Sequence, residues 1–205
     1  ATLSAIGAGM LAGLVTGLLY TKGKIPSLLA GILTMTAIYS VNLRIMGKSN
    51  ISLLGKPTLF NGRFMTSLPQ YFDSVVMGII VIAIITILMV LFLATDYGQA
   101  FIATGDNPTM AKSLGIHTDK MVIVGLMVSN GMVGLCGALI AQNNSYADIN
   151  MGIGTIVIAL ASIIIGEVAF GELTLNQRLV AVTLGSIIYR IILLVVLQLG
   201  FSAND

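Results

Sequence analysis

Two long uncharged runs constrain this chain more than any other feature of its sequence. Residues 74–95 and 121–147 contain no Asp, Glu, Lys or Arg over 22 and 27 positions. An α-helix needs about 20 apolar residues to cross the hydrocarbon layer of a bilayer. Each run is therefore long enough to span a membrane. Both are also too uniformly apolar for the alternating strands of a membrane β-barrel.

The rest of the sequence repeats this pattern. Only 9% of its 205 residues are charged and 57% are hydrophobic, whereas soluble domains contain about 25% charged residues. We therefore expect an all-α integral membrane protein, a polytopic helical bundle. Uncharged runs predict six spans, at roughly 1–20, 26–45, 74–95, 121–142, 151–168 and 179–200. Since the chain opens without Met inside one apolar run and ends just after another, we expect a fragment of a larger fold.

Composition argues against several functions. The net charge of +2 gives no basic surface for nucleic acid. His117 and Cys136 are the sole residues of their kinds, so the sequence shows neither a catalytic pair nor a cluster of metal ligands. A phosphate-binding loop ending at residues 47–49 would require glycine where Asn42 stands. We predict no catalytic residue and no metal site, and any ATP hydrolysis would belong to another subunit.

Residues 95–120 form the longest polar interval in the second half of the chain. Asp106 or Asn107 suits the N-cap of a helix, and Pro108 suits its first position. Gly115 suits the position just after a helix end. This pattern predicts a two-turn helix that begins at Pro108 and stops before Gly115. Such a short helix is marginal alone, so it must pack on another surface, and a partner protein is one candidate.

Within this interval, GDNPTMAKSLGI resembles the G-x-N-x-x-x-A-x-x-x-G-I loop of ABC importer permeases of the branched-chain amino acid and ribose type. The matching positions are Gly105, Asn107, Ala111, Gly115 and Ile116. The similarity continues through VIVGLMVSNGMVGLCGALIAQ and NMGIGTIVIALASIIIGE, and it covers at least Phe101 to Glu167. The stretch LAGILTMTAIYSVNLRIMG resembles a bacterial subfamily associated with uptake of amino acids, of the aromatic type.

The resemblance implies a permease subunit that works as a homodimer in the bacterial cell membrane, inner or plasma. It implies one transmembrane domain over residues 1–205, with a cytoplasmic coupling loop at 96–120 that docks on a separate ATPase. ATP and Mg would bind that ATPase and not this chain. An extracellular substrate-binding lipoprotein or periplasmic protein would deliver the solute. The expected coupling residues are Gly105, Asn107, Pro108, Met110, Ala111, Leu114, Gly115 and Ile116, with Met110, Ala111 and Leu114 near one face.

Lys and Arg divide almost evenly between the two sides of the predicted spans, so charge does not decide the orientation. The resemblance alone places the 95–120 loop in the cytoplasm. On the other side, residues 46–73 alternate apolar and polar positions, which predicts a segment along the membrane surface that could receive a delivery protein. Its apolar positions are Leu53, Leu54, Leu59, Phe60 and Phe64.

Polar side chains inside the spans are candidates for a translocation path. They are Thr36, Tyr39, Ser40, Asn130, Glu167 and Arg190. Asn130 could equally bond a neighbouring helix. Arg190 lies deep in its span, so we expect it to be shielded from lipid and held by carbonyls or by a carboxylate, with Glu167 the nearest candidate in sequence. A different function, an ion-coupled secondary transporter, would use Glu167 and Arg190 as its coupling groups.

The first span carries Gly9, Gly13 and Gly17 at intervals of four residues. Glycines at this spacing let two helix backbones approach closely in a membrane. We expect packing within the chain, with a contact between two copies as the alternative.

Overall fold

The computed structural model describes residues 2–55, 72–152, 154–171 and 174–198. Its helices are α1 (Thr2–Thr21), α2 (Ser27–Met46), α3 (Phe72–Leu93), α4 (Asp96–Asp106), α5 (Pro108–Ser113), α6 (Thr118–Asn144), α7 (Thr155–Phe170) and α8 (Leu175–Gln198). Two short strands, β1 (Asn50–Ser52) and β2 (Tyr146–Asp148), and the 3-10 turn η2 (Ile149–Gly152) complete the described elements. The chain divides into two compact units, Ala1–Met151 and Gly152–Asp205.

Six described segments are long and apolar enough to cross a membrane: α1, α2, α3, α6, α8, and the segment Ile149–Phe170, which joins η2 to α7. This confirms the predicted class, a polytopic helical membrane protein, and the number of spans. The largest differences are at helix ends. For example, α6 begins at Thr118 and ends at Asn144, outside the predicted 121–142. Hydropathy marks the apolar middle of a helix, whereas backbone hydrogen bonds continue into its polar ends.

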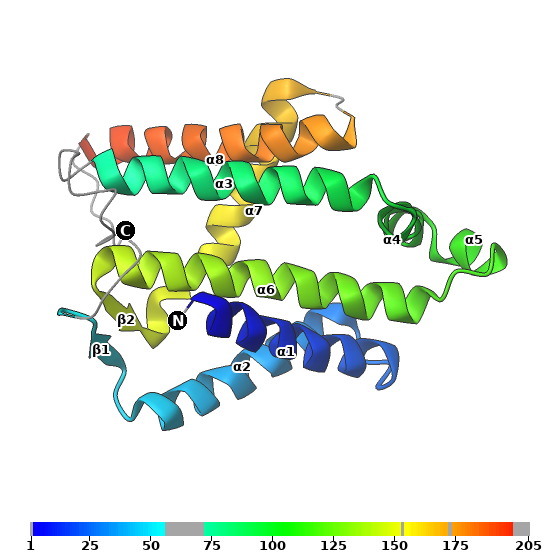
Figure 1. Ribbon diagram of the computed structural model, residues 1–205, viewed down its shortest axis with the longest axis horizontal. Coiled ribbons are helices and arrows are strands. Elements are labelled where there is room, and N and C mark those ends of the chain that lie inside the picture. The colour runs from blue at the N-terminus through cyan, green and yellow to red at the C-terminus, as the bar shows by residue number, and fades with distance from the viewer. Residues whose placement is uncertain (1, 56–71, 153, 172–173, 199–205) are drawn as a thin grey trace. The chain divides into compact units, whose positions relative to one another are not determined.

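In the first unit, α1 lies along α6, as Figure 1 shows, and the two helices run in opposite directions. A methyl group added to Gly13 would overlap the carbonyl oxygen of Leu126, and one added to Gly9 would overlap the carbonyl oxygen of Asn130. At Gly17 it would lie 3.0 Å from the Cα of Ile123. The glycine spacing therefore serves packing within the chain, as expected.

Helix α2 packs on α1 through small and hydroxyl side chains. Ala30 is fully buried, and Thr34 is 5% exposed. The hydroxyl oxygens of Thr16 on α1 and Thr34 on α2 lie 2.9 Å apart, and Thr34 also donates to the carbonyl oxygen of Ala30 at 2.9 Å. Both hydroxyls therefore have hydrogen-bond partners, which they need because no water reaches an interface inside the hydrocarbon layer.

Strands β1 and β2 were not predicted. They pair antiparallel, with Asn50 opposite Asp148 and Ser52 opposite Tyr146. The Asn50 side chain also donates to a carboxylate oxygen of Asp148 at 3.4 Å. This two-stranded sheet ties the segment after α2 to the end of α6. Of the predicted surface segment, Leu59, Phe60 and Phe64 lie outside the described residues.

In the second unit, α7 and α8 pack antiparallel through another pair of glycines. A methyl group on Gly166 would lie 2.6 Å from the carbonyl oxygen of Ala181. One on Gly185 would overlap the carbonyl oxygen of Ser162 and lie 2.9 Å from the Cα of Gly166. These contacts fix the register of the two helices, because side chains at other positions would hold the backbones apart.

Candidate functional site

The polar interval begins with a tight corner between α3 and α4. The Thr95 side chain accepts a hydrogen bond from the amide of Gly98 at 3.2 Å, which caps α4. The Gln99 side chain donates to the carbonyl oxygen of Leu93 at 2.8 Å. A methyl group on Gly98 would lie 2.5 Å from the Cα of Leu93, so only glycine fits. The sequence did not predict α4, since its 11 residues lack a long apolar run.

Asn107 is the single residue that separates α4 from α5. Its backbone amide donates to the carbonyl oxygen of Ala103 at 3.0 Å, which ends α4. Its side-chain oxygen accepts from the amide of Met110 at 3.0 Å, which begins α5. Pro108 occupies the first turn of α5, as predicted. Of the two N-cap candidates, Asn107 is the one used, because Asp106 remains within α4.

The end of α5 is closed by a Schellman motif. Gly115 has a φ of +83°, in the left-handed region that favours glycine. Its amide donates to the carbonyl oxygen of Lys112 at 3.1 Å, and the amide of Ile116 donates to that of Ala111 at 3.1 Å. The predicted short helix is confirmed, with its last helical residue at Ser113 and Leu114 as its C-cap.

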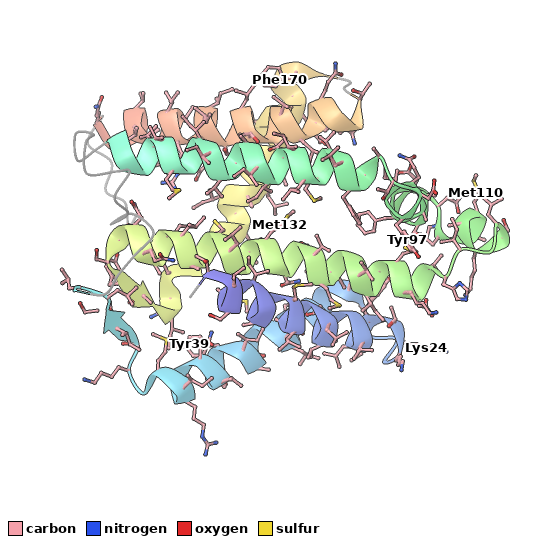
Figure 2. The ribbon with its side chains drawn as sticks, viewed as in Figure 1. Lys24, Tyr39, Tyr97, Met110, Met132 and Phe170 are labelled. Atoms are coloured by element: carbon pink, nitrogen blue, oxygen red, sulfur yellow. The ribbon has the colours of Figure 1, made fainter. Side chains whose placement is uncertain are left out.

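The three side chains predicted to share one face of α5 are divided by the fold. Ala111 is 1% exposed and faces the protein, whereas Met110 is 58% exposed and Leu114 is 66% exposed. Figure 2 shows Met110 projecting from α5. Tyr97 of α4 lies at the same end of the first unit. A bulky charged residue at Ala111 would therefore disturb packing before it reached any partner. Met110 and Leu114 form the exposed apolar face of α5.

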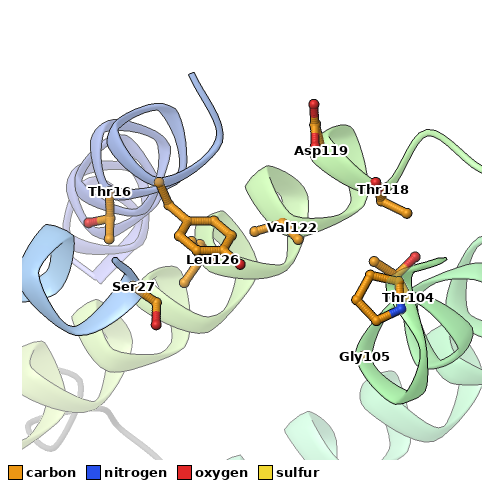
Figure 3. A pocket seen from close by; sticks show the side chains of 10 residues that line it. Thr16, Ser27, Thr104, Gly105, Thr118, Asp119, Val122 and Leu126 are labelled. Atoms are coloured by element: carbon orange, nitrogen blue, oxygen red, sulfur yellow. The ribbon is translucent and has the colours of Figure 1, made fainter. Parts of the chain in front are cut away.

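A cavity of about 420 Å³ lies next to the start of α5. Figure 3 shows how its walls come from different helices. Thr16 and Tyr20 come from α1, Thr104 and Gly105 from the end of α4, and Asp119 from the first turn of α6. Pro108 also lines it. The α4–α5 junction therefore borders open space on the side that faces α1 and α6.

The predicted polar face of α2 lies away from its contact with α1. Thr36, Tyr39 and Ser40 are exposed, whereas Ala30 and Thr34 are buried. The Thr36 hydroxyl donates to the carbonyl oxygens of Ile32 and Leu33. The Ser40 hydroxyl donates to the carbonyl oxygen of Thr36. Their hydrogen bonds thus stay within α2. The sequence missed Thr16 and Thr34, whose only signal is a hydroxyl residue in each of two consecutive spans.

Asn130 of α6 lies at the contact with α1. Its side chain is half-buried and donates to the carbonyl oxygen of Leu126, one turn earlier in the same helix, at 2.9 Å. Its backbone carbonyl faces Gly9. The bond of the Asn130 side chain thus stays within α6, and it is the backbone carbonyl that meets α1.

Of the partners considered for Arg190, the carboxylate of Glu167 is wrong. Since Gly166 faces Ala181 and Ser162 faces Gly185, Glu167 lies at the level of Val180. Arg190 is ten residues further along α8, a rise of about 15 Å. Both side chains are exposed within their unit. Proximity in sequence suggested the pair, but the register of the glycine contacts prevents it.

Residues 1–204 match the family described as branched-chain amino acid transport system / permease component. The chain belongs to this family. It is a permease of the ABC importer type, a multi-pass protein of a bacterial membrane and a transport subunit, not an enzyme. No solved structure matches the chain significantly.

Three relatives illustrate the family. The chain is 45% identical to a tyrosine transport system permease protein of Clostridioides difficile (strain R20291), over all of this chain and 67% of the relative. It is 33% identical to the uncharacterized protein RP368 of Rickettsia prowazekii (strain Madrid E), over 98% of this permease and 71% of that protein. It is 28% identical to the autoinducer 2 import system permease protein LsrC of Escherichia coli (strain K12 / DH10B), over 78% of this permease and 46% of that protein.

Proposed function

We propose that this permease forms part of the membrane path of an ATP-driven importer for an amino acid, and that α5 couples it to a separate ATPase subunit. Family membership supports this function over an ion-coupled secondary transporter. The name of the 45% identical relative, a tyrosine transport permease, supports an amino acid with an aromatic side chain as the solute. ATP and Mg would bind the ATPase, and an extracellular binding protein would deliver the solute.

The observation that carries the coupling role is the architecture of α5. Asn107 and Gly115 fix both ends of the helix, and Ala111 anchors its inner face. Two large apolar side chains, Met110 and Leu114, remain exposed on a segment that lies outside the six spans. A rigid helix with an apolar face is what a groove on a partner protein binds. The cavity beside Pro108 leaves room for α5 to shift when that partner moves.

For the path, we propose the exposed polar face of α2 and Arg190 of α8 as lining groups. Thr36, Tyr39 and Ser40 would contact hydrated solute, because polar side chains in a span avoid lipid. Asn130, at the contact with α1, and Glu167, near the end of α7, are the remaining polar candidates for the path. A second copy of the permease would complete the path as a homodimer, since α2 leaves this polar face uncovered within its own unit.

The test of coupling is a charge placed on the exposed face of α5. Met110→Asp and Leu114→Asp should abolish most uptake by proteoliposomes that contain the permease, its ATPase and loaded binding protein, because a buried charge opposes docking. Thr109→Asp is the matched control. It adds the same charge to the same helix, in the first turn where an acid is favourable.

The expected result is normal insertion of all three variants, with loss of ATPase copurification in the first two only. If Met110→Asp and Leu114→Asp retain both the bound ATPase and normal uptake, α5 is not the coupling element.

A further inference from the structure

Arg190 occupies an unusual position for a charged residue in a span. It lies eight residues before the end of α8 and fifteen after its start, about 12 Å and 22 Å along the axis. Arg178, three residues from the start of the same helix, can extend its side chain to the membrane surface. Arg190 lies much deeper, so its guanidinium requires protein, water or solute around it.

The side of α8 opposite its α7 contact carries Arg190 and, one and two turns before it, the hydroxyl residues Ser186 and Thr183 among leucines. At about 100° per residue, Thr183, Ser186 and Arg190 lie within about 60° of one another. Ala181 and Gly185, which contact α7, lie on the opposite side of the helix. The hydroxyls of Thr183 and Ser186 donate to carbonyl oxygens of α8 itself. The polar stripe of Thr183, Ser186 and Arg190 lies opposite the α7 contact, with Arg190 exposed and the two hydroxyl residues half-buried.

The described spans offer Arg190 no carboxylate at its own depth. Beyond their first turns, the single acidic residue is Glu167, which lies about 15 Å away along the helix axes. A second copy does not change this, because two copies inserted in the same orientation hold equivalent residues at equal depth. The guanidinium thus presents its donors to whatever passes along this stripe.

We propose that Arg190 binds the carboxylate of the transported amino acid during its passage through the membrane. A guanidinium fits a carboxylate with two parallel hydrogen bonds and stays charged in an apolar environment. Thr183 and Ser186 line the same face and keep it wet. This inference rests on the proposed function, since it assumes that α8 borders the path and that the solute carries a carboxylate.

The experiment uses cysteine chemistry in a Cys136→Ser background, because Cys136 is the one cysteine of the sequence. Arg190→Cys is reconstituted with the ATPase and loaded binding protein and then treated with methanethiosulfonates that add an ammonium, a neutral methyl or a sulfonate group. Ile191→Cys is the matched control, because Ile191 lies at nearly the same depth but about 100° further round α8. The Ile191 side chain is 55% exposed. Uptake and the extent of labelling are both measured.

We expect Arg190→Cys to lower uptake about tenfold, as for the loss of a hydrogen bond to a charged group. The ammonium adduct should restore much of it, and the methyl and sulfonate adducts should not. The Ile191→Cys variant should resist the water-soluble reagents. Equal recovery with the ammonium and methyl adducts would overturn recognition of the carboxylate while leaving the path intact. No labelling at position 190 would remove Arg190 from the path, and the role of α5 would stand.

If the Arg190→Cys variant does not assemble with its partners, a second pair of variants tests the same proposal. Arg190→Lys keeps a cation and Arg190→Gln keeps only polarity. At equal amounts of assembled complex, the lysine variant should keep part of the uptake, because it keeps the charge but loses one of the two parallel hydrogen bonds, and the glutamine variant should keep less. Equal uptake by the two would overturn the proposal.

Discussion

The contact between α1 and α6 and the outer face of α2 belong to the same unit but are built from opposite kinds of residues. The contact uses Gly9, Gly13 and Gly17 to bring two backbones together. The outer face of α2 instead presents Thr36, Tyr39 and Ser40. Burial of apolar surface gives no driving force inside the hydrocarbon layer, because the lipid tails are themselves apolar. The α1–α6 contact is therefore held together by close packing. The polar side chains on the outer face of α2 have no such packing role, and we assign them to the translocation path.

The largest effect should come from filling the α1–α6 contact. Gly13→Leu would drive a side chain into the carbonyl oxygen of Leu126, where rigid backbone cannot yield. We expect a loss of at least about 3 kcal/mol in the free energy of unfolding, at the upper end for overpacking. Thermal unfolding of the purified permease in detergent measures it.

Gly7→Leu is the control for that change. It makes the same substitution in α1, but no atom lies within 4 Å of the added Cβ. Its effect should stay within about 0.5 kcal/mol, as for a surface change. Similar unfolding temperatures for the two variants would mean that the glycines do not set the α1–α6 distance.

Local patterns in the sequence were enough to predict the spans and α5. Hydropathy marks each span, and the caps Asn107 and Gly115 lie within a few residues of the helix that they bound. Pairings between distant segments were missed or wrong. The strands β1 and β2 join residues 98 apart, as Asn50 and Asp148 show. Nothing local in either segment identifies its partner.

The same reason explains the error over Glu167 and Arg190. Opposite charges on consecutive spans suggest a pair, but the register of α7 against α8 is set by Gly166 and Gly185. Which face of α2 meets α1 was also not readable, and so Thr16 and Thr34 were missed. The burial of Ala111 likewise depends on how α5 lies against the rest of the first unit.

An intermediate effect on stability is expected from alanine at two glycines of the family motif, Gly115 and Gly105, and it should differ in sign between them. Gly115→Ala must adopt a φ near +83°, which costs about 1 kcal/mol for a residue with a Cβ, and it weakens the cap of α5. Gly105→Ala lies within α4 with nothing within 4 Å of the new methyl group, so it should stabilise the helix by up to about 1 kcal/mol. Unfolding temperatures measure both changes.

Uptake sharpens that result. If Gly105→Ala is stable but transports poorly, Gly105 serves a partner or a movement beside the cavity and not the fold. Equal destabilisation by the two substitutions would contradict the separate roles assigned here to Gly105 and Gly115.

The smallest effect concerns the hydroxyl contact between α1 and α2. Thr16→Val and Thr34→Val each remove one side of a 2.9 Å contact, and the double variant removes both. Hydrogen bonds between helices in a membrane contribute about 0.6 kcal/mol on average, so we expect a coupling energy of that size from the double-mutant cycle.

Thr36→Val supplies the comparison with the outer face of α2. Its hydroxyl bonds only carbonyl oxygens of its own helix, so its coupling to Thr16→Val should be zero within error. Its effect should appear in uptake instead, because we place Thr36 on the path. A coupling between Thr16 and Thr36 as large as that between Thr16 and Thr34 would mean that α2 is rotated about its axis. The face assigned to the path would then be the packed face.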